Sequence, residues 1–168
     1  IDQADSKNSH KAIKSLEDIA RAHPEWLDVH VTLGRLLQAV GKRQRAHATL
    51  DRIPSLYEEG KIRRAKDLKW LAVALMLLDF PKDANEIFAE ANRINPEDHD
   101  LHIQWGNLLF KNHNPAEAMQ SYESAMKIWP DHPEALIGKA RILFRAANNL
   151  PEANAVLEKA LLLNPKNS

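Results

Sequence analysis

The sequence has no cysteine, no long apolar run and no excess of charge of either sign, and each absence excludes a class of protein. Without cysteine, the chain has no disulfide, no thiolate metal site and no cysteine nucleophile. Its longest apolar run, Trp70 to Leu78, is far shorter than the roughly 18 residues that span a bilayer. We therefore expect no direct insertion into a membrane.

The 23 Lys and Arg residues balance the 23 Asp and Glu residues, so the formal net charge is zero. A nucleic-acid-binding domain would carry a basic excess, and we expect no nucleic-acid partner. The 168 residues, 44% of them hydrophobic, suit one folded domain or one short run of repeats. Ile1 to His10 contain no Met and no apolar signal core, so we expect a segment of a longer protein. The sequence does not indicate the cellular compartment of the protein.

The sequence signatures of common enzymes are also missing. There is no H-E-x-x-H zinc pattern, no G-x-S-x-G nucleophile turn and no glycine-rich phosphate loop among only five glycines. We therefore predict no catalytic residue, no cofactor and no enzymatic activity.

A repeated pattern of apolar and small residues ends at four prolines. In each segment the spacing reads 4, 3, 3 and 2 residues, and steps of 4 and 3 place side chains on one stripe of an α-helix. The proline marks where the helix has already ended. The four sets are Ala12, Leu16, Ile19, Ala22, Pro24; Ala84, Phe88, Ala91, Ile94, Pro96; Ala118, Tyr122, Ala125, Ile128, Pro130; and Ala153, Leu157, Ala160, Leu163, Pro165.

A second pattern ends in a small residue, which lets a neighbouring helix approach closely, and recurs along the chain. Its members are Leu33-Gly34, Leu71-Ala72, Trp105-Gly106 and Lys139-Ala140. Equivalent positions are 34 residues apart from Leu71 to Trp105 and from Trp105 to Lys139, and 38 apart from Leu33 to Leu71. Two linked patterns with one period predict pairs of helices.

With this period the chain resembles the tetratricopeptide repeat family, whose unit of about 34 residues is a helix-turn-helix. The best match runs from His99 to His132, and its pattern residues are Trp105, Gly106, Leu109, Phe110, Ala118, Tyr122, Ala125 and Pro130. The resemblance implies an all-α, right-handed superhelical solenoid over residues 1–168. It has a half repeat at 8–23 and full repeats at 27–60, 65–98, 99–132 and 133–168. We predict nine helices and no strand, with the last helix over Leu150 to Leu163.

Two repeats depart from the pattern. In the first full repeat, Glu58 stands where proline is expected and Pro54 intrudes, so we predict a helix that stops early or kinks. The four extra residues there predict a longer connection that contains Gly60. In the last repeat one residue is added between Ala147 and Pro151, which predicts a lengthened turn.

His99 and His102 lie three residues apart at the start of a predicted helix, a spacing that could present two imidazoles to one metal. No third ligand converges on them, and His102 occupies the position of Leu68 and Leu136 in neighbouring repeats. We therefore favour a packed interface residue and predict no metal site. Five other histidines are interpreted as solvated: His10, His23, His47, His113 and His132. The tryptophans are interpreted mainly as packing residues, with only Trp70 also lining a surface.

The resemblance implies a binding face on the first helix of each repeat, which a solenoid exposes on its concave side. Equivalent positions form three rows: Val31, Lys69, Ile103, Ile137; Arg35, Val73, Asn107, Arg141; and Gln38, Met76, Phe110, Phe144. The predicted partner-binding residues are Arg35, Lys69, Met76, Ile103, Asn107, Phe110, Ile137, Arg141, Phe144 and Arg145.

In this face, Phe110 and Phe144 would anchor an apolar side chain of a peptide, and Arg141 and Lys69 would hold acidic groups. The alternative is that several of the apolar side chains pack within the array. The family's clamp for a C-terminal carboxylate uses Lys and Asn in successive repeats, and only Lys69 and Asn107 match it here.

The last predicted helix carries more apolar residues than one inward stripe needs: Ala153, Val156, Leu157, Ala160, Leu161, Leu162 and Leu163. We expect a further helix of a longer chain, or a second copy of this chain, to cover them. Self-association through this C-terminal helix is therefore expected at high concentration.

Three functions remain open from the sequence. The leading hypothesis is a protein-interaction module, a scaffold or adaptor that holds a protein or peptide ligand in its concave groove. The alternative is a non-catalytic repeat region of a larger bacterial envelope or hydrolase protein, which docks its own neighbouring domain or self-associates. The third is a metal-dependent enzyme built on His99 and His102.

Overall fold

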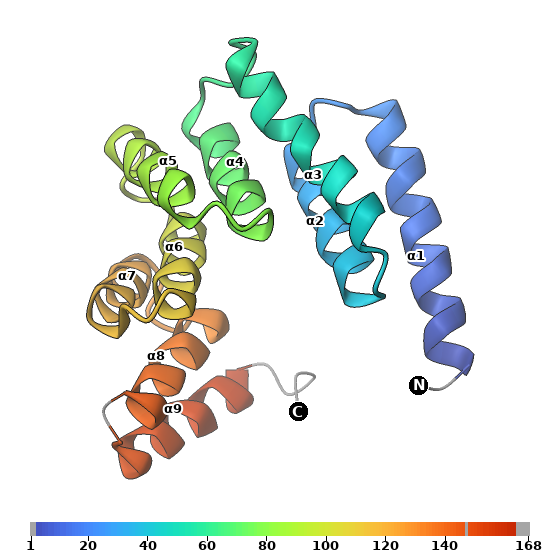
Figure 1. Ribbon diagram of the computed structural model, residues 1–168. Helices are drawn as coiled ribbons and strands as arrows, with labels where there is room; N and C mark the ends of the chain where they lie inside the picture. The colour runs from blue at the N-terminus through green and yellow to red at the C-terminus, as the bar shows by residue number, and fades with distance from the viewer. Residues whose placement is uncertain (1–2, 147, 164–168) are drawn as a thin grey trace. The chain divides into compact units, whose positions relative to one another are not determined.

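The computed structural model describes residues 3–146 and 148–163, and within them the chain forms helices and no strand (Figure 1). The helices are α1 (Gln3–Ala22), α2 (Leu27–Ala39), α3 (Arg43–Glu58), α4 (Ala65–Leu77), α5 (Pro81–Ile94), α6 (His99–Lys111), α7 (Pro115–Ile128), α8 (Pro133–Arg145) and α9 (Leu150–Leu163). This confirms the predicted all-α fold of nine helices for the described residues. The helix α1 starts at Gln3, earlier than the predicted half repeat.

The chain divides into two compact units, residues 1–90 and residues 91–168, and the division falls within α5. In the first unit α2 packs against α1, α3 and α4. In the second unit α7 packs against α6 and α8, and α8 packs against α9. Helices that follow one another along the chain therefore pair within each unit, as helix-turn-helix repeats require. A single solenoid over residues 1–168 stays a prediction.

Three of the second helices end in the same way. The helices α1, α5 and α7 end at Ala22, Ile94 and Ile128, each two residues before a proline. A proline disfavours the helical conformation of the residue before it, which confirms that these prolines follow the helix ends. Turns of four residues then lead into α2, α6 and α8.

The helix α3 ends differently, because it lacks that proline. It continues through Pro54 to Glu58, so the predicted early stop is wrong. Gly60 follows with φ +74°, and its N–H donates to the Tyr57 carbonyl. The next N–H, from Lys61, donates to the carbonyl of Leu56. These two bonds form a Schellman motif, in which glycine takes the left-handed conformation and closes the helix.

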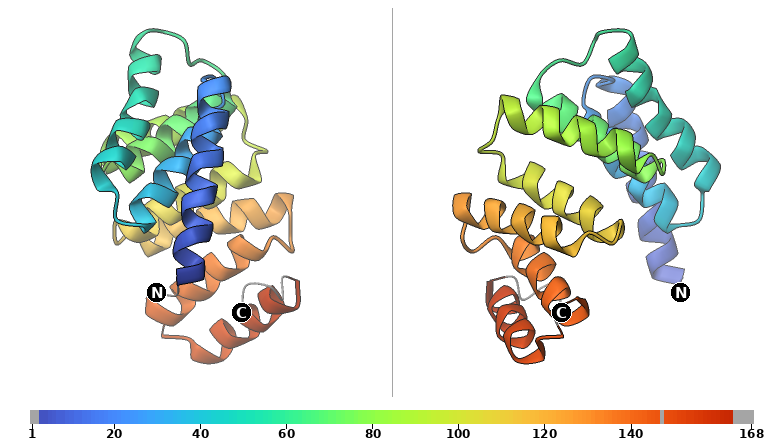
Figure 2. Two further views of the ribbon diagram at one scale, coloured as in Figure 1. Left: turned by 90° about the vertical axis from the view of Figure 1, so that its right-hand side faces the viewer. Right: turned by 60° about the vertical axis from the view of Figure 1, so that its left-hand side comes forward.

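The four extra residues of this repeat are shared between the helix and the connection. The helix α3 has 16 residues where α5, α7 and α9 have 14. The connection from 59 to 64 has six residues where the other links from second to first helix have four. This confirms the predicted longer connection, which Figure 2 shows as a wide loop between α3 and α4. Its Ile62 is only 2% exposed and so anchors the loop.

The apolar run of the sequence lies in α4. Leu71, Ala72, Val73 and Ala74 are all buried, which fits the interpretation of a first helix packed on both sides. None of the described helices combines the length and the apolar character that a bilayer span requires.

The turn between α8 and α9 spans 146–149, four residues where the corresponding turns have three. This confirms the predicted lengthening, although Ala147 itself lies outside the described residues. Lys139, which replaces an apolar residue of the repeat pattern, is half-buried, with its Nζ 3.8 Å from a carboxylate oxygen of Glu152.

Candidate functional site

Phe110 and Phe144 lie near the C-terminal ends of α6 and α8, one 34-residue repeat apart. Phe110 is half-buried against the core of residues 91–168, whereas Phe144 is 56% exposed. The guanidinium carbon of Arg141 lies 4.7 Å from the centre of the Phe110 ring, within cation–π range. The two first helices of this unit therefore present an aromatic ring with a cation against its face.

A pocket of about 530 Å³ opens beside this pair, between the ends of α6 and α8 and the α6–α7 turn. We call it the α6–α8 pocket; its lining residues are Phe110, Lys111, His113, Pro115, Arg141, Arg145 and Ala146. None of these is acidic. Lys111 and Arg145 stand in the last turns of their helices, where the helix dipole favours cations. The pocket therefore suits an acidic ligand group next to an apolar one.

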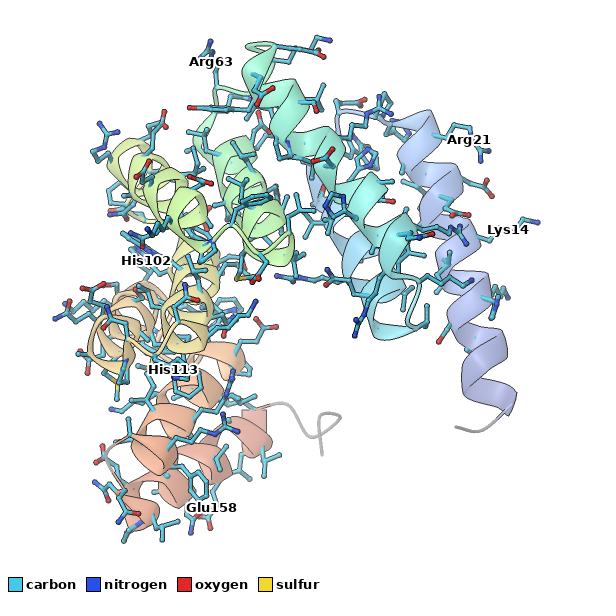
Figure 3. The ribbon with its side chains drawn as sticks, viewed as in Figure 1. Lys14, Arg21, Arg63, His102, His113 and Glu158 are labelled. Carbon is cyan, nitrogen blue, oxygen red and sulfur yellow. The ribbon has the colours of Figure 1, made fainter. Side chains whose placement is uncertain are left out.

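The turn residue His113, labelled in Figure 3, has φ +58° and closes the end of α6. Its N–H donates to the Phe110 carbonyl, and the Asn114 N–H donates to the Leu109 carbonyl. The Asn114 side chain then accepts from the N–H of Glu117 and caps α7. These bonds fix the turn that forms one wall of the α6–α8 pocket.

Asn107 is tied to the core behind this face. Its Oδ1 accepts a hydrogen bond of 2.8 Å from the hydroxyl of Tyr122, which is fully buried. Burial raises the pKa of Tyr122 to about 12, against an opposing effect of Arg141. Gly106 and Gly138 leave room for this ring, since a Cβ at either would come within 3 Å of it.

The other predicted residues of this unit differ in exposure. Ile103 is fully buried in the core around Tyr122, and Ile137 is half-buried. Neither lines the α6–α8 pocket. The structure therefore brings Phe110, Arg141 and Arg145 together at one pocket, with Ile103 and Asn107 behind them.

In residues 1–90 the predicted side chains also differ in exposure. Arg35 is exposed on α2, Lys69 is buried on α4 and Met76 is half-buried near the end of α4. The Lys69 ammonium lies 5.2 Å from the centre of the Trp70 ring. Arg35 is therefore the most accessible of the three.

His102 is buried, and its Nε2 lies 2.8 Å from the Pro96 carbonyl oxygen, which confirms its packed role. His99 packs instead with Trp129 and His132, at ring distances of 5.2 and 5.1 Å. In the part of the chain that the structure describes, no three His, Cys, Asp or Glu side chains are grouped to hold a metal.

Two interpretations of turn residues are wrong. His132 is half-buried rather than solvated, and burial lowers its pKa, with a smaller effect of His99. Trp129 and Trp26 are 48% and 46% exposed rather than packed inside. The turns between repeats keep these rings at the surface, where Trp26 stacks on His23 at 4.0 Å.

The repeat rows do not contain Lys111, His113 or Pro115, because each row takes one position from each first helix and none from the turn or from α7. The lining of the α6–α8 pocket comes partly from the turn after α6. The signal was present in Lys111, a cationic residue that immediately follows Phe110 in the sequence.

Comparison with known proteins supports the repeat pattern. Residues 109–168 match the model of a family described as tetratricopeptide repeat. Human tetratricopeptide repeat protein 21A is 36% identical over 92 residues, which are 54% of this chain and only 7% of the length of that protein.

Solved structures share the fold at low identity. TTC0263, a thermophilic TPR protein of Thermus thermophilus, has a TM-score of 0.72 at 21% identity, covering 97% of this chain and 87% of its own. YrrB, described as a TPR protein with an unusual peptide-binding site, has a TM-score of 0.60 at 16% identity, with coverages of 97% and 81%. MamA has a TM-score of 0.60 at 19% identity, with coverages of 99% and 97%.

Helical repeat proteins of this fold serve in general as scaffolds for protein interaction. The two linked sequence patterns, the paired helices and the family match lead to one assignment. The chain has the fold of tetratricopeptide repeat proteins, and its residues 109–168 match the model of that family.

Proposed function

We propose that the chain is a protein-interaction module that binds a peptide segment of a partner protein on the face of its first helices. The observation that carries the proposal is the Arg141 guanidinium on the Phe110 ring, beside a pocket whose lining has cations and no carboxylate. A matching peptide brings an acidic group to the cations and an apolar side chain to the ring. Charge-assisted hydrogen bonds and aromatic contacts supply most of the binding free energy.

The other residues of the face have graded roles in this proposal. Phe144 and Arg145 are exposed at the end of α8 and contact the peptide directly. Asn107, Ile103 and Ile137 hold the helices in place from behind. In residues 1–90, the residues that contact a peptide are Arg35, Lys69 and Met76. The peptide-binding site of YrrB supports the general mode of action.

The test selects binding peptides from a random-sequence library and measures their affinity for four proteins. These are the parent chain and the variants Phe144→Ala, Arg141→Gln and Lys127→Gln. We expect Phe144→Ala and Arg141→Gln to weaken binding about tenfold or more, since aromatic and arginine anchors dominate interfaces. Lys127 is exposed on α7, a second helix, so Lys127→Gln should leave the affinity unchanged. Equal binding by all four proteins, or peptides mapped to α7, would contradict the proposal.

Self-association is a second candidate function, because α9 leaves several leucines uncovered. Leu162 is 85% exposed, and Leu161 and Leu163 are 45% and 44% exposed. A second copy of the chain that packs on them removes this apolar surface from water. Sedimentation at rising protein concentration should show a dimer that Leu162→Ser weakens and Glu158→Gln does not; Glu158 is exposed on the same helix (Figure 3). A parent chain that stays monomeric at high concentration counts against this function.

A further inference from the structure

Residues 1–90 contain a smaller pocket of about 280 Å³ where the α1–α2 turn meets the connection from 59 to 64. We call it the insertion pocket, because four extra residues of the first full repeat form part of its wall. Its lining residues are Pro24, Glu25, Leu27, Arg52, Leu56, Lys61, Ile62, Arg64 and Asp67. This volume is slightly below the roughly 300 Å³ at which the range for pockets of drug-sized ligands begins, and it suits a group of about the size of one amino-acid residue.

The repeat pattern alone does not provide this pocket. Its wall depends on the Schellman motif at Gly60, which turns the chain back at the end of α3. Ile62 then enters the interior at 2% exposure, and Leu27 is 5% exposed. Together with the half-buried Leu56, these side chains make an apolar floor.

The lining of the pocket contains three cationic side chains, Arg52, Lys61 and Arg64, and two carboxylates, Glu25 and Asp67. Asp67 accepts hydrogen bonds from Arg64 at 2.7 and 3.2 Å. Lys61 pairs with Glu59 at 2.5 Å, and Glu25 lies 3.6 Å from the His23 ring. Arg52, by contrast, pairs with no carboxylate among the described residues. A guanidinium that lines a partly apolar pocket and pairs with no carboxylate favours an anionic ligand.

His30 is a buried histidine that lines a neighbouring hollow together with Arg52. It is 6% exposed, and its Nε2 has no hydrogen-bond partner within the described residues. Its pKa is lowered first by burial and then by Arg52. The charged groups that face His30 are Asp28 on its own helix, Glu17 and Arg21 of α1, and Arg45 and Arg52 of α3. A carboxylate bound to Arg52 would offset this repulsion.

We propose that the insertion pocket binds a ligand in which one apolar group of about leucine size is joined closely to one carboxylate. The apolar group lies on Leu27, Leu56 and Ile62, and the carboxylate accepts hydrogen bonds from Arg52. This is the chemistry of an apolar residue at the C-terminus of a peptide and of a short branched fatty acid. The site is separate from the α6–α8 pocket and does not depend on its proposed function.

The experiment titrates the full chain with N-acetyl-leucine and follows the methyl signals of Leu27, Leu56 and Ile62 by NMR. We expect these signals to shift with saturation and the pKa of His30 to rise in the bound state. N-acetyl-leucinamide, which has no carboxylate, should bind about tenfold more weakly. Titration with 4-methylpentanoate, which has no amide, separates the two sources, because equal binding indicates a free acid and weaker binding a peptide end.

Two variants make the test specific. Arg52→Gln should lower the affinity for N-acetyl-leucine about tenfold, while its methyl spectrum without ligand stays that of a folded chain. Arg63→Gln is the matched control. Arg63 lies in the connection from 59 to 64 that forms part of the pocket wall, but it does not line the pocket and it projects outward (Figure 3). The proposal is overturned if N-acetyl-leucine leaves the three methyl groups unshifted, if the amide binds equally, if Arg52→Gln binds as the parent does, or if the His30 pKa stays unchanged.

Discussion

The two units solve the same packing problem with different residues. In residues 91–168 the second helix α7 puts Tyr122 at the centre, and glycines on both neighbouring first helices make room for it. In residues 1–90 the second helix α3 has Leu50 at the equivalent position, against Gly34 alone. A large rigid ring needs small neighbours on two sides, whereas a leucine needs one. The repeat pattern therefore constrains the combined volume of the side chains that meet at a contact, and it does not require a particular residue at each position.

The second helices α3 and α7 also differ in how they end. The helix α7 is ended by the approach of Pro130, while α3 contains a proline and is ended by Gly60. The glycine ending leaves a longer connection, and that connection supplies part of the insertion pocket. A local change in helix termination thus gives one unit a cavity that the regular repeat lacks.

Gly138→Ala should destabilise residues 91–168 by about 3 kcal/mol, the upper end of the cost of overpacking. The new Cβ would lie 2.4 Å from the Tyr122 ring, which is rigid and hydrogen-bonded to Asn107. Gly34→Ala in the other unit should cost only about 1 kcal/mol, because Leu50 can change rotamer and alanine favours the helix. Urea unfolding followed by methyl NMR signals of each unit measures both. Equal losses would show that ring rigidity does not decide the difference.

Pro54→Ala should stabilise residues 1–90 by about 2 kcal/mol. The substitution restores an N–H to the interior of α3, where proline costs about 3 kcal/mol, and it gives back about 1 kcal/mol in unfolded-chain entropy. Pro115→Ala is the control, because Pro115 is the first residue of α7 and interrupts no helical hydrogen bond. The same urea measurement should show no gain there. A destabilised Pro54→Ala would mean that the helix geometry depends on the proline.

Tyr122→Phe should cost residues 91–168 about 1 kcal/mol, because it removes the hydrogen bond to Asn107. It should also flatten the loss of stability at alkaline pH. The pKa of Tyr122 is about 12 in the folded chain and about 10 when unfolded, so the unfolded form loses its proton first. Stability contributed by this group is therefore complete below about pH 10 and falls as the pH rises toward 12. A Tyr122→Phe chain with the parent's alkaline profile would refute this assignment.

Acidic pH should produce the smallest effect, through His30 in one unit and His132 in the other. Burial lowers the pKa of both histidines, so the unfolded chain takes up protons more readily than the folded chain. The stability that the two neutral histidines contribute is therefore complete above about pH 6.5. It falls as the pH drops through their lowered pKa values in the folded chain. His30→Gln should flatten this dependence for residues 1–90, and His132→Gln for residues 91–168. Thermal unfolding at pH 7.5 and 5.5 checks both, and unchanged slopes would contradict it.

Much of the fold was predictable because its signals are local. The spacing of Ala118, Tyr122 and Ala125 predicts one face of a helix, and the prolines predict where helices have ended. The termination of α3 was predicted only in part. The intrusion of Pro54 suggested an early stop, but burial of Leu50 and Ile53 on the same helix outweighs the lost hydrogen bond.

The sequence predicted which positions of the candidate site are equivalent in successive repeats, but it did not predict how exposed each side chain is. Phe110 and Phe144 are equivalent in the repeat, yet one is half-buried under Arg141 and the other is exposed. Equivalent positions have different neighbours, and only the packed helices determine which side chain covers which. The contribution of turn residues such as His113 also depends on how the chain folds back after α6.

The helical period, the number of helix pairs and the place of the longer connection could be predicted from the sequence, because each follows from the spacing of residues along one chain. Side-chain exposure and the pockets depended instead on long-range packing between helices. This packing buries Ile103 and Lys69, brings Asn107 into a hydrogen bond with Tyr122, and forms the insertion pocket and the α6–α8 pocket from residues that are far apart in the sequence. The physical reason is that helix formation depends on neighbours a few residues away, whereas burial and charge pairing depend on side chains from other helices.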